Sequence, residues 1–473
     1  MERRANIICT IGPASSDIDT LRSLIDAGMD IARLNFSHGT HDEHERMIAH
    51  IREAADGLGK PIAILQDLQG PKIRTGSMPD DGVELREGTE FIISTDHDGI
   101  GDDTRVGSTY EALPLEVDVG QTMLLDDGYL SLEIVDIRGN EIHTVVRNGG
   151  TLKSNKGIIV PGATISAPPI SEKDIKDLAF GLSAGVDAVA LSFVRSERDI
   201  IELRATMKYL GRNVPCIAKI ERWEGVSDID DIIEEADAIM VARGDLGLEM
   251  PAEQVPVLQK DIIRRCNFHG KPVITATQML ESMISNARPT RAEASDVANA
   301  VLDGSDCVML SGETSIGAWP VQAVSYMDRI IRAIEHTTDA AARTHAVPVE
   351  DHLNAADAIG RACRVIAEQI SADAIVTLTT SGGTARVIAK YRPSIPILAL
   401  TDRENTLREL AFVWGTRPVL IPPLTDMEHD LGRLGSYLVE HGLCRRNDRI
   451  VFSAGSPLQN RSATNMLEIR KLQ

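Results

Sequence analysis

The chain has 473 residues, which is enough for about three domains. Its formal net charge of −21 and sequence pI of about 5.0 argue against a nucleic-acid partner, since no strongly basic stretch offsets the repulsion. Aromatic residues make up only 3% of the chain, so platforms for stacking single-stranded bases are also scarce.

The cysteines and the N-terminus bear on the cellular compartment. None of the six cysteines forms a CxxC pair, which argues against a zinc site and a disulfide framework and fits a reducing compartment. They are Cys9, Cys216, Cys266, Cys307, Cys363 and Cys444. The segment MERRANIICTIG enters an apolar run after a few residues, and neither a signal peptide nor a membrane span is visible. We therefore expect a cytoplasmic protein that does not contact membranes.

Eight short apolar runs follow one another, the number of strands in a (β/α)8 barrel. They are NIICTIG, DIARLNFS, IAILQDL, DAVALSFV, CIAKIE, AIMVARGD, PVITATQ and CVMLSGE. Amphipathic segments lie between most of them, and several end in a glycine, as a left-handed helix cap requires. These glycines are Gly28, Gly59, Gly185, Gly270 and Gly304. The alternation predicts an α/β fold with a parallel TIM barrel and no repeat beyond the βα unit.

One interval, between the third and fourth runs, lacks helical periodicity. Residues 72–168 contain short strand-like segments with tight turns, such as TEFIIST, TMLLDD, YLSLEIVDI and EIHTVVRN. We expect a small all-β lid domain inserted into a barrel loop.

A polar stretch, AARTHAVPVEDHLNA, predicts a linker near residue 345, and α/β alternation resumes after it as an open, doubly wound sheet. The expected domains are the barrel (residues 1–71 and 169–344), the lid (72–168) and a C-terminal α/β domain (345–473).

Polar residues are concentrated near the C-terminal ends of the predicted barrel strands, where catalytic side chains of such barrels lie. Residues two apart on a strand share a face. The pairs and triplets expected to share one are Lys219 with Glu221, Arg33 with Asn35 and Ser37, Arg243 with Asp245, and Thr275 with Thr277. Any one of these charges could belong to a structural ion pair, but charges of both signs stacked in a barrel mouth are costly without a ligand.

Glu221 and Asp245 end consecutive strands, and a divalent cation would relieve their mutual repulsion. Mg²⁺ prefers a few carboxylates and fills its remaining positions with substrate oxygens and water. Arg33, Arg74 and Lys219 would then face an anionic substrate, which is the equipment of phosphoryl transfer.

Several other motifs carry weaker signals. The chain has no GxxxxGK[ST] motif, and VARGDLG is not a dinucleotide fingerprint. His38, His41 and His44 lie where a helix begins, and we expect solvated side chains rather than a metal cluster. Lys153 and Lys156 in GGTLKSNKG are expected in a solvated loop. TTSGGTAR opens a predicted helix and suits either a phosphate or an ordinary N-cap.

Six stretches of the chain resemble the corresponding stretches of pyruvate kinases. They are ARLNFSHG, KIE, VARGDLG, TATQMLESM, PTRAEASDVANAVLDG and MLSGET, which occur in this order, and the resemblance extends over essentially the whole chain. It implies transfer of the phosphoryl group of phosphoenolpyruvate to ADP, giving pyruvate and ATP, and a homotetramer.

The resemblance also implies roles at matching positions. Glu221 and Asp245 would hold Mg²⁺, with Mn²⁺ as a substitute, and Lys219 would stabilise the phosphoryl group in flight and the enolate oxygen. Arg33 and Arg74 would grip the phosphate. The remaining assignments are Gly244 and Asp245 for the substrate carboxylate, Thr277 for proton delivery, Glu313 for its support, and Asn35, His38, Arg74 and Lys156 for the nucleotide side.

The stretch LQDLQGPKIRTG departs from the usual family pattern, DTKGPEIRTG, in which a glutamate stands at the position of Lys72. In that pattern a K⁺ ion lies among ligands that match Asn35, Ser37, Asp67 and the carbonyl of Leu68. An ammonium is a compact unit charge. We therefore expect Lys72 to replace K⁺ and to make the enzyme independent of it.

In the C-terminal domain, Thr380, Ser381, Gly382, Gly383 and Thr384 match the family's phosphate-cradling effector loop, and SAGSPLQNRSATN would supply the distal contacts to an effector that the sequence does not identify. Two other functions stay open at this point. A lyase acting on pyruvate enolates would not need the lid or Lys156, and a silent metabolite-binding regulator would not need both metal carboxylates.

Overall fold

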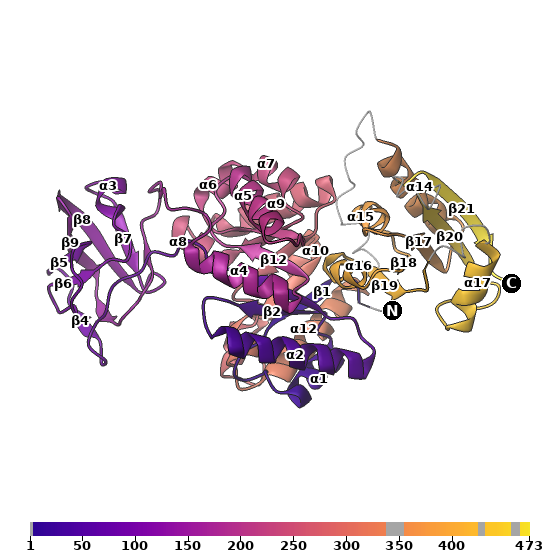
Figure 1. Cartoon of the computed structure of the whole chain (residues 1–473), viewed down its shortest axis with the longest axis horizontal. Helices are drawn as coiled ribbons and strands as arrows, with labels where there is room; N and C mark the ends of the chain where they lie inside the picture. The colour runs from indigo at the N-terminus through magenta and orange to yellow at the C-terminus, as the bar shows by residue number, and fades with distance from the viewer. Residues whose placement is uncertain (1–2, 337–353, 424–430, 456–463) are drawn as a thin grey trace.

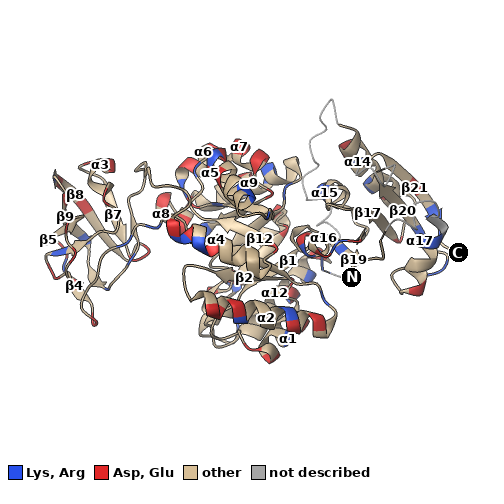
Figure 2. Ribbon diagram, in the orientation of Figure 1, with Lys and Arg blue, Asp and Glu red and all other residues tan. Residues whose placement is uncertain are grey.

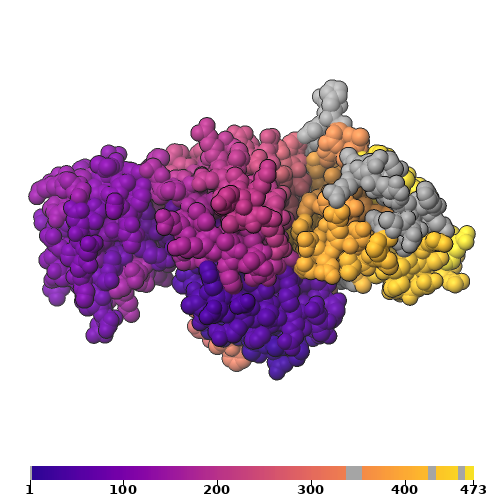
Figure 3. Space-filling model, in the orientation of Figure 1, coloured from indigo at the N-terminus to yellow at the C-terminus, as the bar shows by residue number. Residues whose placement is uncertain are grey.

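The computed structural model describes residues 3–336, 354–423, 431–455 and 464–473. The lid, the barrel and the C-terminal domain follow one another along the longest axis of the molecule, with the barrel in the middle (Figures 1 and 3). The predicted linker near residue 345 lies outside the described residues.

Eight parallel strands form the closed barrel, in the spatial order β1-β16-β15-β14-β13-β12-β3-β2. The strands are β1 (Asn6–Thr10), β2 (Ile31–Asn35), β3 (Ala63–Asp67), β12 (Ala188–Leu191), β13 (Cys216–Ile220), β14 (Ala238–Ala242), β15 (Val273–Ala276) and β16 (Cys307–Leu310). Each predicted apolar run supplies one strand, so the predicted TIM barrel is confirmed.

Five barrel helices end at the glycines that the sequence predicted, and three begin with capping boxes. Thr40, Ser171 and Thr290 form capping boxes, and all five predicted glycines cap helices at positive φ, from +61° at Gly59 to +124° at Gly28. The helices are α1 (Ile18–Ala27), α2 (His41–Leu58), α4 (Glu172–Ala184), α5 (Glu197–Tyr209), α6 (Trp223–Ser227), α7 (Ile229–Glu235), α8 (Arg243–Glu249), α9 (Val255–His269), η1 (Glu281–Ile284), α10 (Arg291–Asp303), α11 (Gly312–Ser315) and α12 (Pro320–Glu335). Acidic and basic residues are interspersed on α1, α2 and α4 (Figure 2).

The barrel interior is filled by alternate strand residues, as a period of two requires. Ile31 on β2, Leu65 on β3 and Ile217 on β13 belong to one buried cluster. Phe412 of the C-terminal domain joins this cluster, and its carbonyl lies 3.6 Å from the sulfur of Cys307. The C-terminal domain therefore closes the N-terminal end of the barrel and leaves the opposite end for the site.

The lid is inserted between β3 and α4 and has its own core, which includes Phe91, Leu132 and Val146. Its main sheet has the order β11-β7-β8-β9-β5-β6, and β10 pairs with β4. The elements are β4 (Val83–Leu85), β5 (Glu90–Ser94), β6 (Arg105–Gly107), α3 (Leu113–Glu116), β7 (Thr122–Leu125), β8 (Leu130–Arg138), β9 (Glu141–Asn148), β10 (Gly150–Leu152) and β11 (Ile158–Ile159). The inserted all-β domain is thus confirmed.

The C-terminal domain is an open sheet of order β19-β18-β17-β20-β21, in which the edge strand β21 is antiparallel. Its elements are α14 (Ala355–Gln369), β17 (Ala374–Leu378), α15 (Gly383–Lys390), β18 (Ile397–Thr401), α16 (Glu404–Glu409), η2 (Leu410–Phe412), β19 (Thr416–Leu420), α17 (Leu431–Glu440), β20 (Arg449–Ala454) and β21 (Met466–Lys471). No helix of the described residues combines the length and apolar character that crossing a membrane requires.

The N-terminal end of the barrel carries an aspartate directly before every second strand. Each one accepts a hydrogen bond from a backbone N–H at the start of the preceding strand, and each also pairs with an arginine. The sets are Asp30 with Ile7 and Arg3, Asp187 with Ile64, Arg52 and Arg408, Asp237 with Cys216 and Arg204, and Asp306 with Val273 and Arg392. The expectation of no repeat beyond the βα unit was therefore wrong, because this feature recurs with every second unit.

Candidate active site

Asp67, at the end of β3, lies at the centre of a buried charge cluster in the barrel mouth. Its Oδ2 lies 2.6 Å from Nε of Arg33 on β2, and its Oδ1 lies 3.3 Å from Nζ of Lys219 on β13. Burial alone would raise the pKa of Asp67, but the two cations outweigh it and lower the pKa. Asp67 therefore stays ionised and holds both cations in place.

Lys219 donates hydrogen bonds to two further groups at this end of the barrel. Its Nζ lies 2.7 Å from the hydroxyl of Ser192 and 2.9 Å from Oε1 of Glu221. Burial alone would lower the pKa of Lys219, but Asp67 and Glu221 outweigh it and raise the pKa above its usual value. The ammonium is a fixed, permanent cation, which suits it to stabilise negative charge on a substrate.

Glu221 and Asp245 are the predicted metal ligands. Burial raises the pKa of Glu221, and the charge of Asp245 raises it further against the opposing effect of Lys219. Within the described residues, no three His, Cys, Asp or Glu side chains are grouped so as to hold a metal ion. Two hard carboxylates whose charges repel each other fit Mg²⁺, which takes its other ligands from substrate and water.

Thr277 follows β15 and adopts a left-handed backbone, with φ of +68°, which is a true outlier for a β-branched residue. Its hydroxyl accepts a hydrogen bond of 2.8 Å from the backbone N–H of Gly244. Gly244 was expected to offer this N–H to a substrate carboxylate, and here the N–H is directed at Thr277 instead. Glu313, fully buried, accepts hydrogen bonds from the N–H groups of Leu280 and Ser311 and so anchors the segment that follows Thr277.

Two of the predicted shared faces are wrong, because both strands end earlier than the sequence suggested. β14 ends at Ala242, so Arg243 and Asp245 lie in the first turn of α8 rather than on a strand. Arg243 bonds the carbonyls of Ala276 and Thr277, and so supports the backbone of the mouth. β15 likewise ends before Thr277, while Thr275 is buried against the hydroxyl of Ser305.

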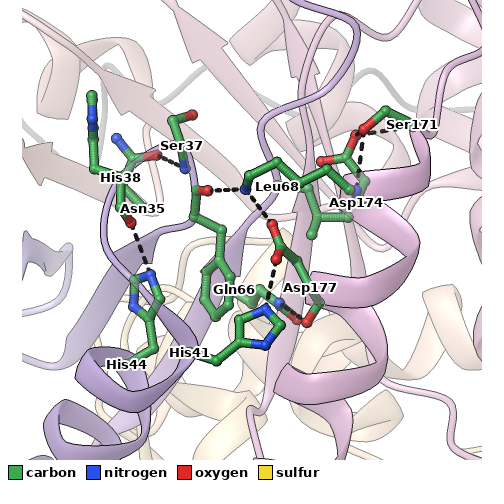
Figure 4. Close-up of polar contacts among 12 residues, drawn as sticks. Asn35, Ser37, His38, His41, His44, Gln66, Leu68, Ser171, Asp174 and Asp177 are labelled. Atoms are coloured by element: carbon green, nitrogen blue, oxygen red, sulfur yellow. Dashed lines mark hydrogen bonds and ion pairs between the residues drawn. The ribbon is translucent and has the colours of Figure 1, made fainter.

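The loop from β2 to α2 holds the predicted nucleotide-side residues Asn35 and His38 (Figure 4). Oδ1 of Asn35 accepts a hydrogen bond from the N–H of Ser37, and the carbonyl of His38 bonds Nε2 of His44 at 3.0 Å. Burial lowers the pKa of His38, and the nearby cations Arg74, Lys72, Arg33 and Lys173 lower it further. A neutral His38 therefore lies among cations at neutral pH.

The expectation that the three histidines are solvated was wrong for His44, whereas the side chain of His41 is 43% exposed although it has partners. His44 is 3% exposed and stacks on Phe36 with ring centroids 3.9 Å apart. His41 lies 2.8 Å from Asp177 of α4 and stacks on Phe180 (Figure 4). His41 thus fastens α2 to α4, whereas His44 packs α2 against Phe36 just past β2. The sequence around the start of α2 does not reveal either contact.

Lys72, Arg74 and Lys156 lie where the chain passes between barrel and lid. The guanidinium of Arg74 donates to the carbonyl of Asn155 at 2.9 Å, and the backbone of Arg74 pairs with Gly157. Lys156 is not the solvated lysine expected, because its Nζ lies 2.7 Å from Asp126 of the lid. The side chain of Lys72 runs along Gly157.

The predicted cation ligands Asn35, Ser37, Asp67 and Leu68 are already engaged with other groups. Asn35 accepts a hydrogen bond from Ser37, and Asp67 pairs with Arg33 and Lys219. The Leu68 carbonyl accepts a hydrogen bond of 2.8 Å from Ser192. Among the described residues, none forms a hydrogen bond or ion pair with the ammonium of Lys72, so the structure does not bring it into contact with these four groups.

The predicted effector loop lies between β17 and α15, as expected. Gly382 caps α15 with φ of +78°, the carbonyl of Thr380 accepts a hydrogen bond from Thr406, and the Ser381 carbonyl accepts one from Arg386. Thr384 is buried and bonded to Thr464. Most of the distal stretch SAGSPLQNRSATN lies outside the described residues.

Two residues of the mouth were missed from sequence. Ser192, just past β12, joins Lys219 to the Leu68 carbonyl through hydrogen bonds. Thr10, at the end of β1, accepts a hydrogen bond of 2.8 Å from Arg33. Strand parity could have found both, because Thr10 continues the inward row of Ile8, and Ser192 that of Ala188 and Ala190.

The fold and this mouth define a barrel enzyme with an inserted lid. Family models described as the pyruvate kinase barrel domain and the pyruvate kinase alpha/beta domain match residues 2–324 and 357–470. The pyruvate kinase of Geobacillus stearothermophilus is 47% identical, with 99% of this chain and 80% of that protein covered, and that of Mycobacterium tuberculosis is 43% identical, with 100% and 99% covered. The solved structure of a pyruvate kinase from Cryptosporidium parvum matches with a TM-score of 0.92 at 39% identity, covering 100% of this chain and 96% of that one.

The chain therefore belongs to the pyruvate kinase family and is a phosphotransferase.

Proposed function

We propose that this protein transfers the phosphoryl group of phosphoenolpyruvate to ADP with one proton consumed, giving pyruvate and ATP, and that it requires Mg²⁺ held by Glu221 and Asp245. The observation that carries the proposal is the buried cluster of Arg33, Asp67, Lys219 and Glu221 at the barrel mouth. A cation fixed by two buried carboxylates is preorganised for an anionic substrate.

Bound Mg²⁺ would supply charge neutralisation to the phosphoryl oxygens. Lys219 contributes a permanent ammonium toward the phosphoryl group in transfer and toward the enolate oxygen that it leaves. Arg33, held by Asp67 and Thr10, orients the phosphate from the opposite side. Little covalent chemistry is left to the protein, so positioning accounts for its contribution.

Proton delivery to the enolate carbon is assigned to the neighbourhood of Thr277. The strained backbone of Thr277 is held by Arg243, and Glu313 fixes the segment that follows. Strain of this kind persists where the surroundings overdetermine a conformation, which is typical of functional sites.

The lid would close over the mouth and exclude water, which would otherwise consume the phosphoryl donor. Arg74 and Lys156 lie on its connecting strands, where closure would bring them toward the nucleotide.

A coupled assay of pyruvate release tests the reaction. We expect release that depends on ADP, disappears when EDTA removes divalent cations, and returns with Mg²⁺ or Mn²⁺. Pyruvate release without ADP would support a lyase instead, and no release under any condition would support a binding protein.

We further propose that the reaction does not require K⁺, with Lys72 supplying the positive charge. Two facts support this. The candidate K⁺ ligands are engaged with other groups, and the positive charge of Lys72 is among those that lower the pKa of His38 further. Lys72 lies on the connection to the lid, so lid closure would change its distance from these ligands.

Replacing Lys72 with glutamate should create a requirement for K⁺. We expect the parent to be equally active with and without K⁺ in sodium-free buffer, and Lys72→Glu to be active only with K⁺. Lys153→Glu, at an exposed lysine of the lid, is the matched control. A parent enzyme that needs K⁺ would refute the proposal.

The proposed function also includes a homotetramer and regulation through the loop from Thr380 to Thr384. Light scattering would test the homotetramer. Thermal shifts with sugar phosphates and nucleotides, compared between the parent and Ser381→Ala, would test the second, and the absence of any response would count against an effector site there.

A further inference from the structure

The chain returns from the lid to the barrel through a return segment, residues 160–171, between β11 and α4. Two barrel residues contact this segment: Arg222, which caps the start of α6, and Glu249, the last residue of α8. α8 lies on the side of the barrel that faces the lid (Figure 1). Neither Arg222 nor Glu249 has a role in the reaction proposed above.

Arg222 holds the return segment through a buried guanidinium. Its side chain is 11% exposed, and Nη2 donates a hydrogen bond of 2.9 Å to the carbonyl of Ala163. The same nitrogen lies 3.7 Å from Oε1 of Glu249, and Nε donates to Glu224 of α6 at 3.2 Å. One cation therefore connects the return segment, α6 and α8.

Glu249 contacts the same segment from α8. Its side chain is 6% exposed, and the backbone N–H of Gly162 stabilises its ionised form. Oε2 of Glu249 and Oε1 of Glu224 are buried without a hydrogen-bond partner among the described residues. The two carboxylates thus share one guanidinium that does not satisfy both, so a displacement of Ala163 would change how its charge is shared.

The lid also touches α8 directly. A Cβ atom at Gly128, in the turn between β7 and β8, would lie 2.8 Å from Cδ2 of Leu248 on α8. Because α8 has only seven residues, a shift of its last turn also moves its first turn, which holds Asp245.

Both contact residues are joined to the proposed metal ligands through short stretches of backbone. Arg222 directly follows Glu221 in the chain. Glu249 follows Asp245 by four positions, which is about one turn of α8. The return segment is therefore connected to the backbone of both ligands.

We propose that Arg222 and Glu249 are positioning residues, which place Glu221 and Asp245 for Mg²⁺ according to the position of the lid. This inference rests on the proposed metal site and adds two residues that act on it through the backbone. Because such a coupling is reciprocal, the lid position that favours metal binding is itself favoured when the metal is bound.

Arg195 provides a comparison, because it holds the same segment without a link to a metal ligand. Its guanidinium donates to the carbonyl of Ile165 at 2.5 Å and pairs with Asp199 of α5. It lies in the loop between β12 and α5, which holds neither proposed metal ligand. If these arginines only anchored the return segment, replacing Arg195 or Arg222 would have the same effect.

Binding of Mn²⁺ to the full-length protein, measured from the electron paramagnetic resonance signal of the free ion, tests the proposal without a reaction. The measurement is made at about pH 8, where Glu249, with a pKa raised by burial to about 7, is mostly ionised. We expect Arg222→Met and Glu249→Gln each to weaken binding about fivefold or more, and Arg195→Met to stay within about twofold of the parent. Thermal unfolding shows that each variant is folded.

The direction of the change separates positioning from simple charge. Loss of a cation near the metal site would strengthen Mn²⁺ binding if charge alone acted, whereas positioning predicts that Arg222→Met weakens it. Arg222→Lys keeps the charge but lacks the planar guanidinium that connects three groups, so it should also weaken binding, and it serves if Arg222→Met does not fold.

Binding as tight as in the parent by Arg222→Met or Glu249→Gln would overturn the proposal. An equal loss in Arg195→Met would also overturn it, because the effect would then come from anchoring of the lid in general. A parent that does not bind Mn²⁺, or a Glu221→Gln variant that binds it as the parent does, would overturn the proposed metal site and this inference with it.

Discussion

Buried acidic residues occur at both ends of the barrel, and they are partnered differently. At the N-terminal end each aspartate accepts hydrogen bonds from a backbone N–H and from an arginine side chain, as Asp187 does from Ile64 and Arg408. At the C-terminal end, burial and the charge of Asp245 raise the pKa of Glu221 although Lys219 is 2.9 Å away. One end satisfies its charges within the fold, whereas the other retains charges that a metal and substrate would complete.

The difference shows how a barrel separates stability from function. The aspartates of the closed end hold neighbouring strands, and through Arg408 and Arg392 they also hold the C-terminal domain. At the open end, the raised pKa of Glu221 means that its charge lowers the stability of the unliganded protein at neutral pH, which is the expected cost of a preorganised site. Asp67 beside it does not carry this cost, because Lys219 and Arg33 outweigh its burial and lower its pKa.

The largest effect is expected for Glu221→Gln. Activity should fall at least 100-fold, because a proposed metal ligand is lost. Stability in metal-free buffer at neutral pH should stay equal or rise, because a raised pKa means that the ionised carboxylate disfavours folding above the unfolded-state pKa. Kinetics and thermal unfolding, with the exposed Glu234→Gln as control, would measure both. An active variant would contradict the site assignment.

The second-largest effect is expected for Asp187→Asn, which should lower stability and leave activity nearly unchanged. This side chain is 1% exposed and forms ion pairs with two arginines. The free energy of unfolding of the variant should therefore fall by about 3–5 kcal/mol, while its turnover number stays within a few fold of that of the parent. Asp237→Asn is the matched comparison at the same end.

Asp237 has a side chain 38% exposed and pairs with Arg204 within the barrel, so its replacement should cost only about 1 kcal/mol. Urea titrations of the two variants would measure the difference. Equal losses would show that the contact of Asp187 with the C-terminal domain adds nothing.

Much of the fold could be predicted because it follows from local patterns. Apolar runs gave the strands, and glycines such as Gly59 and Gly185 marked the helix ends. Strand parity was correct for Lys219 with Glu221, whose side chains lie 2.9 Å apart although β13 itself ends at Ile220. It failed for Asp245, because the chain had already entered a helix.

The rest depended on contacts that no local pattern contains. Arg408 and Asp187 are separated by 221 positions, and the aspartate repeat gains its meaning only when the strands close into a barrel. His44 looked like a solvated residue at the start of a helix until Phe36 was seen to cover it.

The smallest effect concerns Glu249, at the end of α8, which lies beside Gly162 in the segment where the chain returns from the lid. Burial raises the pKa of Glu249 to about 7, while Arg222 lowers it and Glu224 raises it further. Arg222 also donates to the carbonyl of Ala163 at 2.9 Å, which ties this group to the lid connection.

Because the folded-state pKa lies above the ordinary value of 4.5 for a glutamate, the contribution of Glu249 to stability is complete below about pH 4.5 and is lost as pH rises through about 7. Glu249→Gln removes this titration. Its free energy of unfolding relative to the parent should therefore increase between about pH 5 and 8, by an amount on the order of 1 kcal/mol, while Glu234→Gln shows no such trend. A difference that does not change with pH would mean that Glu249 is already ionised throughout this range, and that the open end carries its excess charge at Glu221 without a second contribution at the lid connection.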